Sequence, residues 1–185
     1  MGLAKYLKAG KMTFNPIDKC IEVVNIGFKI KYCDVINQDW GQIYEKYVGQ
    51  IFEEKGYKVF YKGLEEGILD HGIDLIAEND IDIIYIQCKY LKKHLTKSHI
   101  EWILYKASQE LLKAYENNTK TVIFMLIVNN IDENFSKRIP KGFSNTISNN
   151  KYPLLEYFLN HNNTQNKVRL ECVEINMRDK VIPQS

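Results

Sequence analysis

Apolar side chains recur every three or four positions in two stretches of the chain, a spacing that predicts two amphipathic helices. The stripe of the first helix, which begins at Asn37, consists of Trp40, Ile43, Tyr44, Tyr47, Val48, Ile51 and Phe52. The stripe of the second helix consists of Ile100, Ile103, Leu104, Ala107, Leu111 and Tyr115. Gly56 lies just past the first helix, where a left-handed C-cap favours glycine, and Asn117 and Asn118 end the second.

Four shorter apolar stretches have the character of β-strands. Three of them lie between the helices, at residues 57–61, 72–77 and 82–89. The turn-prone sequence Glu78-Asn79-Asp80 separates the last two, so we expect them to pair as a hairpin. The fourth, residues 120–128, is a continuous apolar run, as in strands that are covered on both faces. The order helix, three strands, helix, strand favours a mixed sheet flanked by helices.

Weaker patterns lie on either side of this series. Residues 20–24 and 28–32 predict a β-hairpin around a glycine turn, which serves either as an added edge element or as a small substrate-contacting arm. After the last strand of the series, the polar residues 129–150 predict a long loop with room for one helical turn. A short helix over 153–160 and a strand over 168–175 are expected to follow.

We therefore predict an α/β (α+β) fold with a central mixed sheet. Residues 1–37 are expected to be an N-terminal extension, and residues 38–185 a single domain that ends in a helix-strand addition at 129–185. A chain of 185 residues is long enough to bury a sizeable core in one such domain.

Composition and charge narrow the classes of protein only a little. The chain is 45% hydrophobic and 26% charged with a net charge of +2, which by itself indicates no nucleic-acid partner. The longest apolar run, residues 122–128, is too short to cross a bilayer, and residues 1–11 lack the apolar stretch of a secretory signal. The four cysteines have no zinc-ligand spacing. We expect a cytoplasmic protein with reduced thiols and no membrane partner.

Candidate chemistry gathers on the predicted hairpin. Gln87 and Lys89 share one face of their strand because strand side chains alternate. If the turn centres near Asn79 and Asp80, Asp74 lies opposite residue 85 and Gln87 is its diagonal neighbour.

A hard cation such as Mg²⁺ prefers oxygen ligands, which are available here as the Asp74 carboxylate, the Gln87 amide oxygen and the Cys88 backbone carbonyl. Lys89 would contact the attacking water or a phosphate oxygen. Glu45, at the border of the first helix's apolar stripe, can lean over whatever that helix packs on. The alternatives are a solvated glutamate and ordinary polar residues at the end of an edge strand.

These residues lie within a larger set of motifs that resembles the Mrr-like branch of the PD-(D/E)XK nuclease superfamily. In chain order the motifs are a helix glutamate, Glu45, followed by Gly56-Tyr57-Lys58-Val59, Asp70-His71-Gly72-Ile73-Asp74 and Gln87-Cys88-Lys89. The resemblance covers roughly residues 38–128, the family-like core, and implies an αβββαβ fold, which agrees with the order of elements above.

The resemblance also implies roles. It assigns catalysis to Glu45, Asp74, Gln87 and Lys89, with Asp74 as the central metal carboxylate and Glu45 reaching the metal directly or through water. Gln87 stands where most superfamily members have an acidic residue, a substitution usual in the Mrr-like branch. Asp70 either assists the site or only shapes the turn before the strand. Mg²⁺ is the implied cofactor, and Mn²⁺ is an alternative ion that could take its place.

Basic residues near the motifs are candidates for binding DNA phosphates. No acidic residue lies between Ile83 and Ile100, where Lys92, Lys93 and Lys97 follow Lys89. A second group consists of Lys137, Arg138 and Lys141. A solvated loop is the alternative explanation of both. Trp102 and Tyr105 are expected to pack in the protein rather than to stack on bases.

The sequence thus supports the hypothesis of a Mg²⁺-dependent DNA endonuclease of restriction or defence type that acts on double-stranded DNA. Cutting both strands requires two sites, which a homodimer would supply. Two alternatives stay open: a structure-specific nuclease, such as a junction resolvase acting in DNA repair or recombination, and a catalytically silent DNA-binding module. The recognised DNA sequence, dependence on methylation and activity on RNA are not specified by these motifs.

Overall fold

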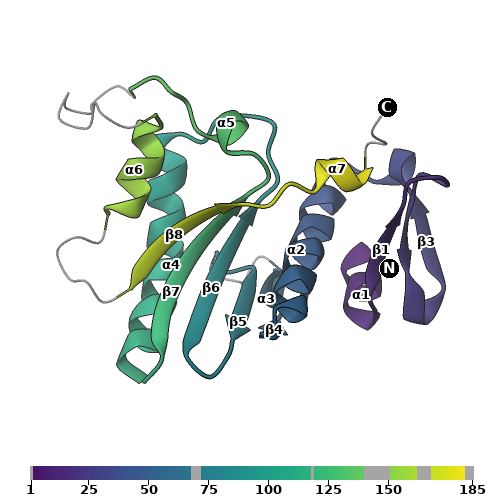
Figure 1. The fold of residues 1–185 in the computed structure, drawn as a ribbon, viewed down its shortest axis with the longest axis horizontal. Coiled ribbons are helices and arrows are strands. Elements are labelled where there is room, and N and C mark those ends of the chain that lie inside the picture. The colour runs from purple at the N-terminus through teal and green to yellow at the C-terminus, as the bar shows by residue number, and fades with distance from the viewer. Residues whose placement is uncertain (1, 68–71, 118, 140–150, 162–167, 182–185) are drawn as a thin grey trace.

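A mixed five-stranded sheet forms the centre of the molecule, with the strand order β4-β5-β6-β7-β8 (Figure 1). The computed structural model describes residues 2–67, 72–117, 119–139, 151–161 and 168–181. The strands are β4 (Lys58–Phe60), β5 (Leu75–Glu78), β6 (Asp82–Lys89), β7 (Thr121–Val128) and β8 (Arg169–Glu174). The pairs β4–β5 and β5–β6 are antiparallel, whereas the pairs β6–β7 and β7–β8 are parallel.

Two long helices cover the opposite faces of this sheet (Figure 1). They are α2 (Asn37–Glu54) and α4 (Lys97–Asn117), and both begin within three residues of the expected positions. Alternate residues of β6 divide between the two sides: Ile84 and Ile86 are buried with α2, whereas Ile83 and Tyr85 are buried with α4. β6 and β7 are buried along nearly their whole length. For β7, this burial was predicted from its continuous apolar run.

The predicted αβββαβ order is confirmed as α2-β4-β5-β6-α4-β7, and the helix-strand addition is confirmed as α6 (Pro153–Leu159) and β8. After residue 37, two short helices were not predicted, α3 (Lys62–Glu66) and α7 (Arg178–Val181), and a third, α5 (Ile131–Asn134), lies in the predicted loop. The α5 helix is the single helical turn allowed for in the loop after β7. Among the described residues, none of the helices is both long and apolar enough to span a membrane.

The N-terminal residues form a small sheet of their own beside α2 (Figure 1). Its three antiparallel strands are β1 (Met12–Asn15), β2 (Cys20–Val23) and β3 (Phe28–Lys31), and together with α1 (Leu3–Ala9) they make up the N-terminal unit. The predicted hairpin is confirmed as β2 and β3. Of the two alternatives for this hairpin, an element added to an edge of the central sheet is wrong, because β1 pairs with β2 and completes a separate sheet. The substrate-contacting arm stays a prediction. The helix α1 and the strand β1 were not predicted.

The N-terminal unit is attached to the domain through a shared core. Leu7, Ile21 and Val23 are fully buried in the same apolar cluster as the inner face of α2. At its border, the backbone N–H of Met12 donates to Gln50 Oε1 at 2.7 Å, and Gln50 Nε2 donates back to the Met12 carbonyl at 2.9 Å. The boundary between an extension at 1–37 and a domain at 38–185 stays a prediction.

Candidate active site

Asp74 and Gln87 face each other across the β5–β6 hairpin. Asp74 directly precedes β5, and its backbone N–H donates to the Ile86 carbonyl at 2.8 Å. Its carboxylate oxygen Oδ2 accepts a hydrogen bond from the Cys88 backbone N–H at 2.6 Å and another from the Gln87 side-chain amide. Both side chains are only 5% exposed. Two hydrogen-bond donors therefore hold this buried carboxylate in place.

The predicted register of this hairpin is wrong by two residues. Leu75 pairs with Ile86, so Gln87 is the direct rather than the diagonal neighbour of Asp74. The reason is the turn, in which Asn79 Oδ1 accepts hydrogen bonds from the backbone N–H groups of Ile81 and Asp82 at 2.8 and 2.7 Å. This places the turn one residue later than expected, and a shift of the turn by one residue moves the pairing by two.

Glu45 approaches the same point from α2. The chain after β4 passes close to Asp74, with the Gly63 backbone N–H donating to the Asp74 carbonyl at 2.8 Å. A Cβ atom on Gly63 would lie 2.7 Å from Glu45 Oε2 and 3.3 Å from the Asp74 Cα atom. A side chain at this position would therefore displace the Glu45 carboxylate, so the half-buried Glu45 side chain and the Asp74 backbone both lie beside Gly63.

Lys89 ends β6, two residues beyond Gln87 and on the same face of the strand. Its charge acts on Cys88, the buried residue between them. Burial raises the pKa of the Cys88 thiol well above its ordinary value, the negative charges of Asp74 and Glu45 raise it further, and Lys89 lowers it. The charges of Asp74, Glu45 and Lys89 thus all act on the same buried thiol, in keeping with their positions near this end of the hairpin.

Lys106 of α4 is a neighbour of the site that the sequence did not reveal. A Cβ atom on Gly72 would lie 3.1 Å from Lys106 Cβ and 3.3 Å from Gln87 Oε1. Gly72 has a φ of +73°, a conformation that favours glycine. The stem of Lys106 therefore packs against the segment that leads into Asp74. No spacing in the sequence links these residues, because the contact depends on how α4 crosses the sheet.

A buried ion pair holds α3 in place beside the site. Lys62 is 7% exposed, and its ammonium group bonds to Glu110 of α4, with Glu66 Oε2 at 3.6 Å. The ion pair connects α3 to α4 and so fixes the path of the chain at Gly63, where Glu45 and Asp74 approach each other.

The donors gathered at the hairpin fit a hard divalent cation. They are the carboxylates of Asp74 and Glu45, the amide oxygen of Gln87 and the backbone carbonyl of Cys88, all of them oxygen atoms. The Cys88 carbonyl lies on the side of the site, 3.4 Å from Gln87 Nε2. The Gln87 amide nitrogen now faces Asp74, so holding a shared ion requires the amide to turn over and present its oxygen.

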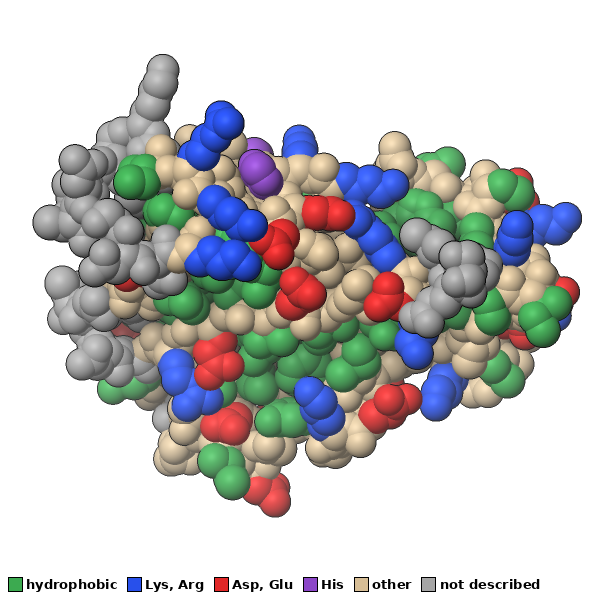
Figure 2. Space-filling model, turned by 45° about the horizontal axis from the view of Figure 1, so that its top comes forward, with side chains coloured by type: hydrophobic (Ala, Val, Ile, Leu, Met, Phe, Trp, Pro, Cys, Tyr) green, Lys and Arg blue, Asp and Glu red, His purple; other side chains and the backbone are tan. Residues whose placement is uncertain are grey.

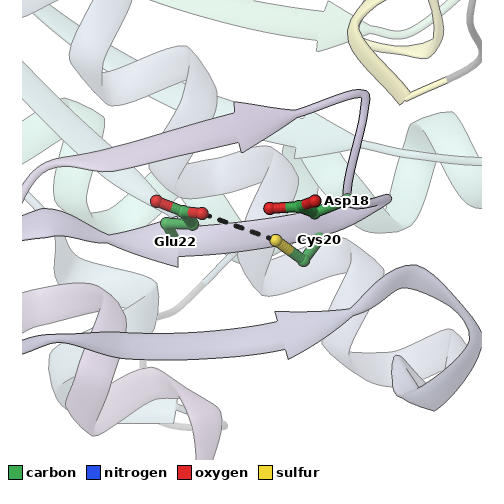
Figure 3. Close-up of side chains that lie close together, drawn as sticks. All are labelled: Asp18, Cys20 and Glu22. Atoms are coloured by element: carbon green, nitrogen blue, oxygen red, sulfur yellow. Dashed lines mark hydrogen bonds between the residues drawn. The ribbon is translucent and has the colours of Figure 1, made fainter.

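A second cluster of potential ligands lies in the N-terminal sheet. Among the described residues, Asp18, Cys20 and Glu22 bring their ligand atoms within 4.8 Å of one another (Figure 3). Lys29 already forms an ion pair with Glu22 at 2.8 Å, and the Cys20 thiol donates to Glu22 at 3.6 Å. The Lys29 ammonium group offsets the negative charge of Glu22, and Asp18 is exposed to solvent. The cluster therefore needs no metal ion to hold it together.

The predicted DNA-binding residues differ in their exposure and in the ion pairs that they form. Lys92, Lys93 and Arg138 are exposed, whereas Lys97 Nζ lies 3.6 Å from Glu101 and Lys137 Nζ lies 3.1 Å from Asp132. Figure 2 shows the corresponding mixture, with acidic and basic side chains interspersed over the face that is turned forward.

Lys92 and Lys93 also line a cavity of about 580 Å³ whose walls include Trp40, Tyr90 and Arg178. The remaining predicted site residues, Asp70 and Lys141, lie outside the described residues, as does His71.

The expectation that Trp102 and Tyr105 pack inside the protein is wrong. Their side chains are 58% and 70% exposed on α4. Their position one turn apart on the helix is compatible with packing, but the buried stripe of α4 is the neighbouring one that contains Ile103 and Ala107.

The region that contains this site matches a known protein family. Residues 38–125 match the Mrr catalytic-domain family model, which is described as restriction endonuclease. No curated protein and no solved structure matches the chain. The matched region extends from the start of α2 into β7, and so contains Glu45, Asp74, Gln87 and Lys89.

Proposed function

Because residues 38–125 belong to the Mrr-like branch of the PD-(D/E)XK nucleases, a restriction-endonuclease type of domain, we propose that the chain is a Mg²⁺-dependent endonuclease that hydrolyses phosphodiester bonds in DNA. The observation that carries the proposal is the convergence of Asp74, Gln87, Glu45 and Lys89 at one end of the β5–β6 hairpin. A restriction or defence role is the setting that the family suggests.

In this proposal the protein supplies an oxygen-lined site for one divalent ion. Asp74, Glu45, Gln87 and the Cys88 carbonyl would hold it, and the bound ion would lower the pKa of a coordinated water and neutralise charge on the phosphate. Mn²⁺, with similar ligand preferences, is expected to replace Mg²⁺.

The remaining residues position these ligands. The Cys88 N–H fixes one oxygen of Asp74, so the carboxylate keeps its orientation without an ion. Lys89, on the Gln87 face of β6, would orient the nucleophile or contact a phosphate oxygen. Exposed Lys92 and Lys93 would bind the DNA backbone farther along the same segment.

The direct test is incubation of plasmid DNA with the protein in Mg²⁺, Mn²⁺ or EDTA. Nicked or linear product in either metal, and none in EDTA, is the expected result. Binding of DNA in a gel-shift assay without cleavage in either metal would favour the catalytically silent DNA-binding module.

The substrate panel should separate the two kinds of nuclease. Methylated and unmethylated plasmids test a restriction activity, and a four-way junction compared with a linear duplex of the same sequence tests a structure-specific one. Sedimentation of the protein with and without duplex tests the proposed homodimer, which would give a double-strand cut two sites.

A further inference from the structure

An exposed aromatic pair lies on α4 near the candidate active site. The rings of Trp102 and Tyr105 stack on each other with centroids 5.6 Å apart and an angle of 22° between their planes. The side chains are 58% and 70% exposed, which is high for residues of this size. The stacked pair presents an apolar surface that the described part of the chain leaves in contact with solvent.

Lys106 joins this surface to the active site. Its ammonium group lies over the Trp102 ring, 5.9 Å from the centroid. Its Cβ atom packs against Gly72, at the same place where Gln87 Oε1 approaches. The apolar surface, the positive charge and the candidate metal ligands are therefore continuous across α4 and the segment before β5.

We propose that Trp102 and Tyr105, with Lys106, form a platform that binds unpaired bases of the DNA substrate beside the active site. The inference rests on the proposed nuclease function and specifies its substrate: DNA with single-stranded or unstacked nucleotides next to the bond that is cut. It gives Trp102 and Tyr105 a binding role and Lys106 a phosphate-binding role.

The chemistry of the surface favours nucleic-acid bases over a protein partner. Each base has a π face that stacks on an aromatic ring without sequence preference, and a lysine beside the ring suits the phosphate that links two bases. A fully paired duplex hides its base faces in the helix stack. The platform is therefore expected to contribute on substrates with gaps, flaps or junctions and little on an intact duplex.

Trp102 itself reports on binding. The chain has two tryptophans, so a Trp40→Phe background leaves Trp102 as the single source of tryptophan fluorescence. Titration with a short oligothymidylate in EDTA measures binding without any cleavage. Stacking predicts quenching of the emission, and a duplex of equal length is expected to quench it much less. No quenching by the oligothymidylate would overturn the proposal.

Variants of the exposed residues provide the second measurement, which does not depend on the Trp40→Phe background. With a labelled oligothymidylate in EDTA, Trp102→Ala is expected to weaken binding about tenfold, the size of one lost base stack. Leu112→Ala is the matched control because Leu112 is 52% exposed on the same helix, about 15 Å farther along it at 1.5 Å per residue. An equal loss of affinity in both variants would show that general surface hydrophobicity, and not base stacking, causes the effect, and would contradict the platform.

Cleavage separates this inference from the nuclease proposal. In Mg²⁺, Trp102→Ala should lower the ratio of gapped-substrate to intact-duplex cleavage by a similar factor. If the wild type cuts duplex but Trp102 is not quenched, the platform is wrong and the nuclease stands. If Trp102 is quenched but no substrate is cut, the binding surface stands and the nuclease is wrong. A change in sedimentation on Trp102→Ala without any change in DNA binding would assign the surface to a protein contact and overturn the proposal.

Discussion

The Asp74–Gln87 pair combines a buried carboxylate with a neutral amide, and this combination lets the site fold without a metal. The amide of Gln87 donates to Asp74, so the pair needs no counterion to be satisfied. A second carboxylate in place of Gln87 would bring two like charges together in a pocket where both side chains are 5% exposed.

Gln87→Glu is therefore expected to lower the melting temperature in EDTA and to show a larger increase than the wild type when Mg²⁺ is added, because a second anionic ligand binds the ion more tightly. One of the two facing carboxyls would have a raised pKa, so the destabilisation in EDTA should grow as the pH rises through that value. Thermal melts with and without Mg²⁺ at several pH values test this. Equal Mg²⁺ responses of variant and wild type would place the ion elsewhere.

Gly72 offers a test of the segment that leads into Asp74. Its φ of +73° and the close approach of Lys106 and Gln87 both oppose a side chain. Gly72→Ala should cost about 1–2 kcal/mol of unfolding free energy from the backbone conformation alone and should reduce cleavage by displacing Gln87. Gly41→Ala is the matched control: a Cβ atom there meets nothing, and the helical position should gain about 0.5–1 kcal/mol. Urea unfolding of both variants distinguishes them, and a stable, fully active Gly72→Ala protein would contradict the site geometry.

The helix α2 makes an especially tight contact with the residue that follows the edge strand β4. Gly49 faces Tyr61, whose ring stacks with the Lys46 ammonium at 4.3 Å and whose hydroxyl donates to Glu53 at 2.9 Å. A Cβ atom on Gly49 would lie 2.6 Å from Tyr61 Cζ, which is too close for two non-bonded carbon atoms.

Gly49→Ala should consequently destabilise the protein by about 1–3 kcal/mol, although alanine is the better helix former. Chemical denaturation measures the loss. Because Tyr61 directly precedes α3 and the Gly63 contact, the displacement should also lower cleavage through Glu45. The Gly41→Ala variant of the same helix again supplies the comparison, and a gain in stability at both positions would show that α2 does not pack on Tyr61 as described.

Local patterns were sufficient to predict most elements, and they failed where a single turn or contact decides the geometry. The stripes of α2 and α4 and the apolar run of β7 were visible because each repeats over eight or more residues. The register of β5 and β6 depends on the Asn79 side chain, which captures two backbone N–H groups, and strand patterns do not contain that information. Alternation along β6 did place Gln87 and Lys89 on one face.

The contacts around the site show the same limit. Gly63 and Lys106 come from elements far from Asp74 in the sequence, and only the folded chain places them beside it. Trp102 and Tyr105 were misjudged because an aromatic residue on a helix is compatible with either of two neighbouring stripes.

At the scale of the whole molecule, the N-terminal unit covers the outer side of α2. Leu3, Leu7 and Met12 are buried in a cluster that also contains Ile43 and Val48 of α2. Removing residues 1–36 would uncover the α2 side chains in this cluster and leave Gln50, which is 8% exposed, without its two bonds to Met12.

We expect deletion of residues 1–36 to lower the melting temperature markedly and to cause self-association, because a contiguous apolar surface on α2 would become accessible. Thermal melting and size-exclusion chromatography measure both effects. A monomeric truncated protein as stable as the full chain would indicate that the N-terminal unit is an independent appendage.

Single-turnover cleavage of plasmid DNA by the wild type, Asp74→Asn and Lys89→Ala tests whether Asp74 and Lys89 act in metal-dependent cleavage. Asp74→Asn retains an oxygen for the Cys88 N–H, and Lys89 is only half-buried at the end of its strand, so both variants should keep the wild-type circular dichroism spectrum and melting behaviour. We expect cleavage by the wild type in Mg²⁺, none in EDTA, and a rate at least about a hundredfold lower in each variant. Cleavage by either folded variant at the wild-type rate would contradict it.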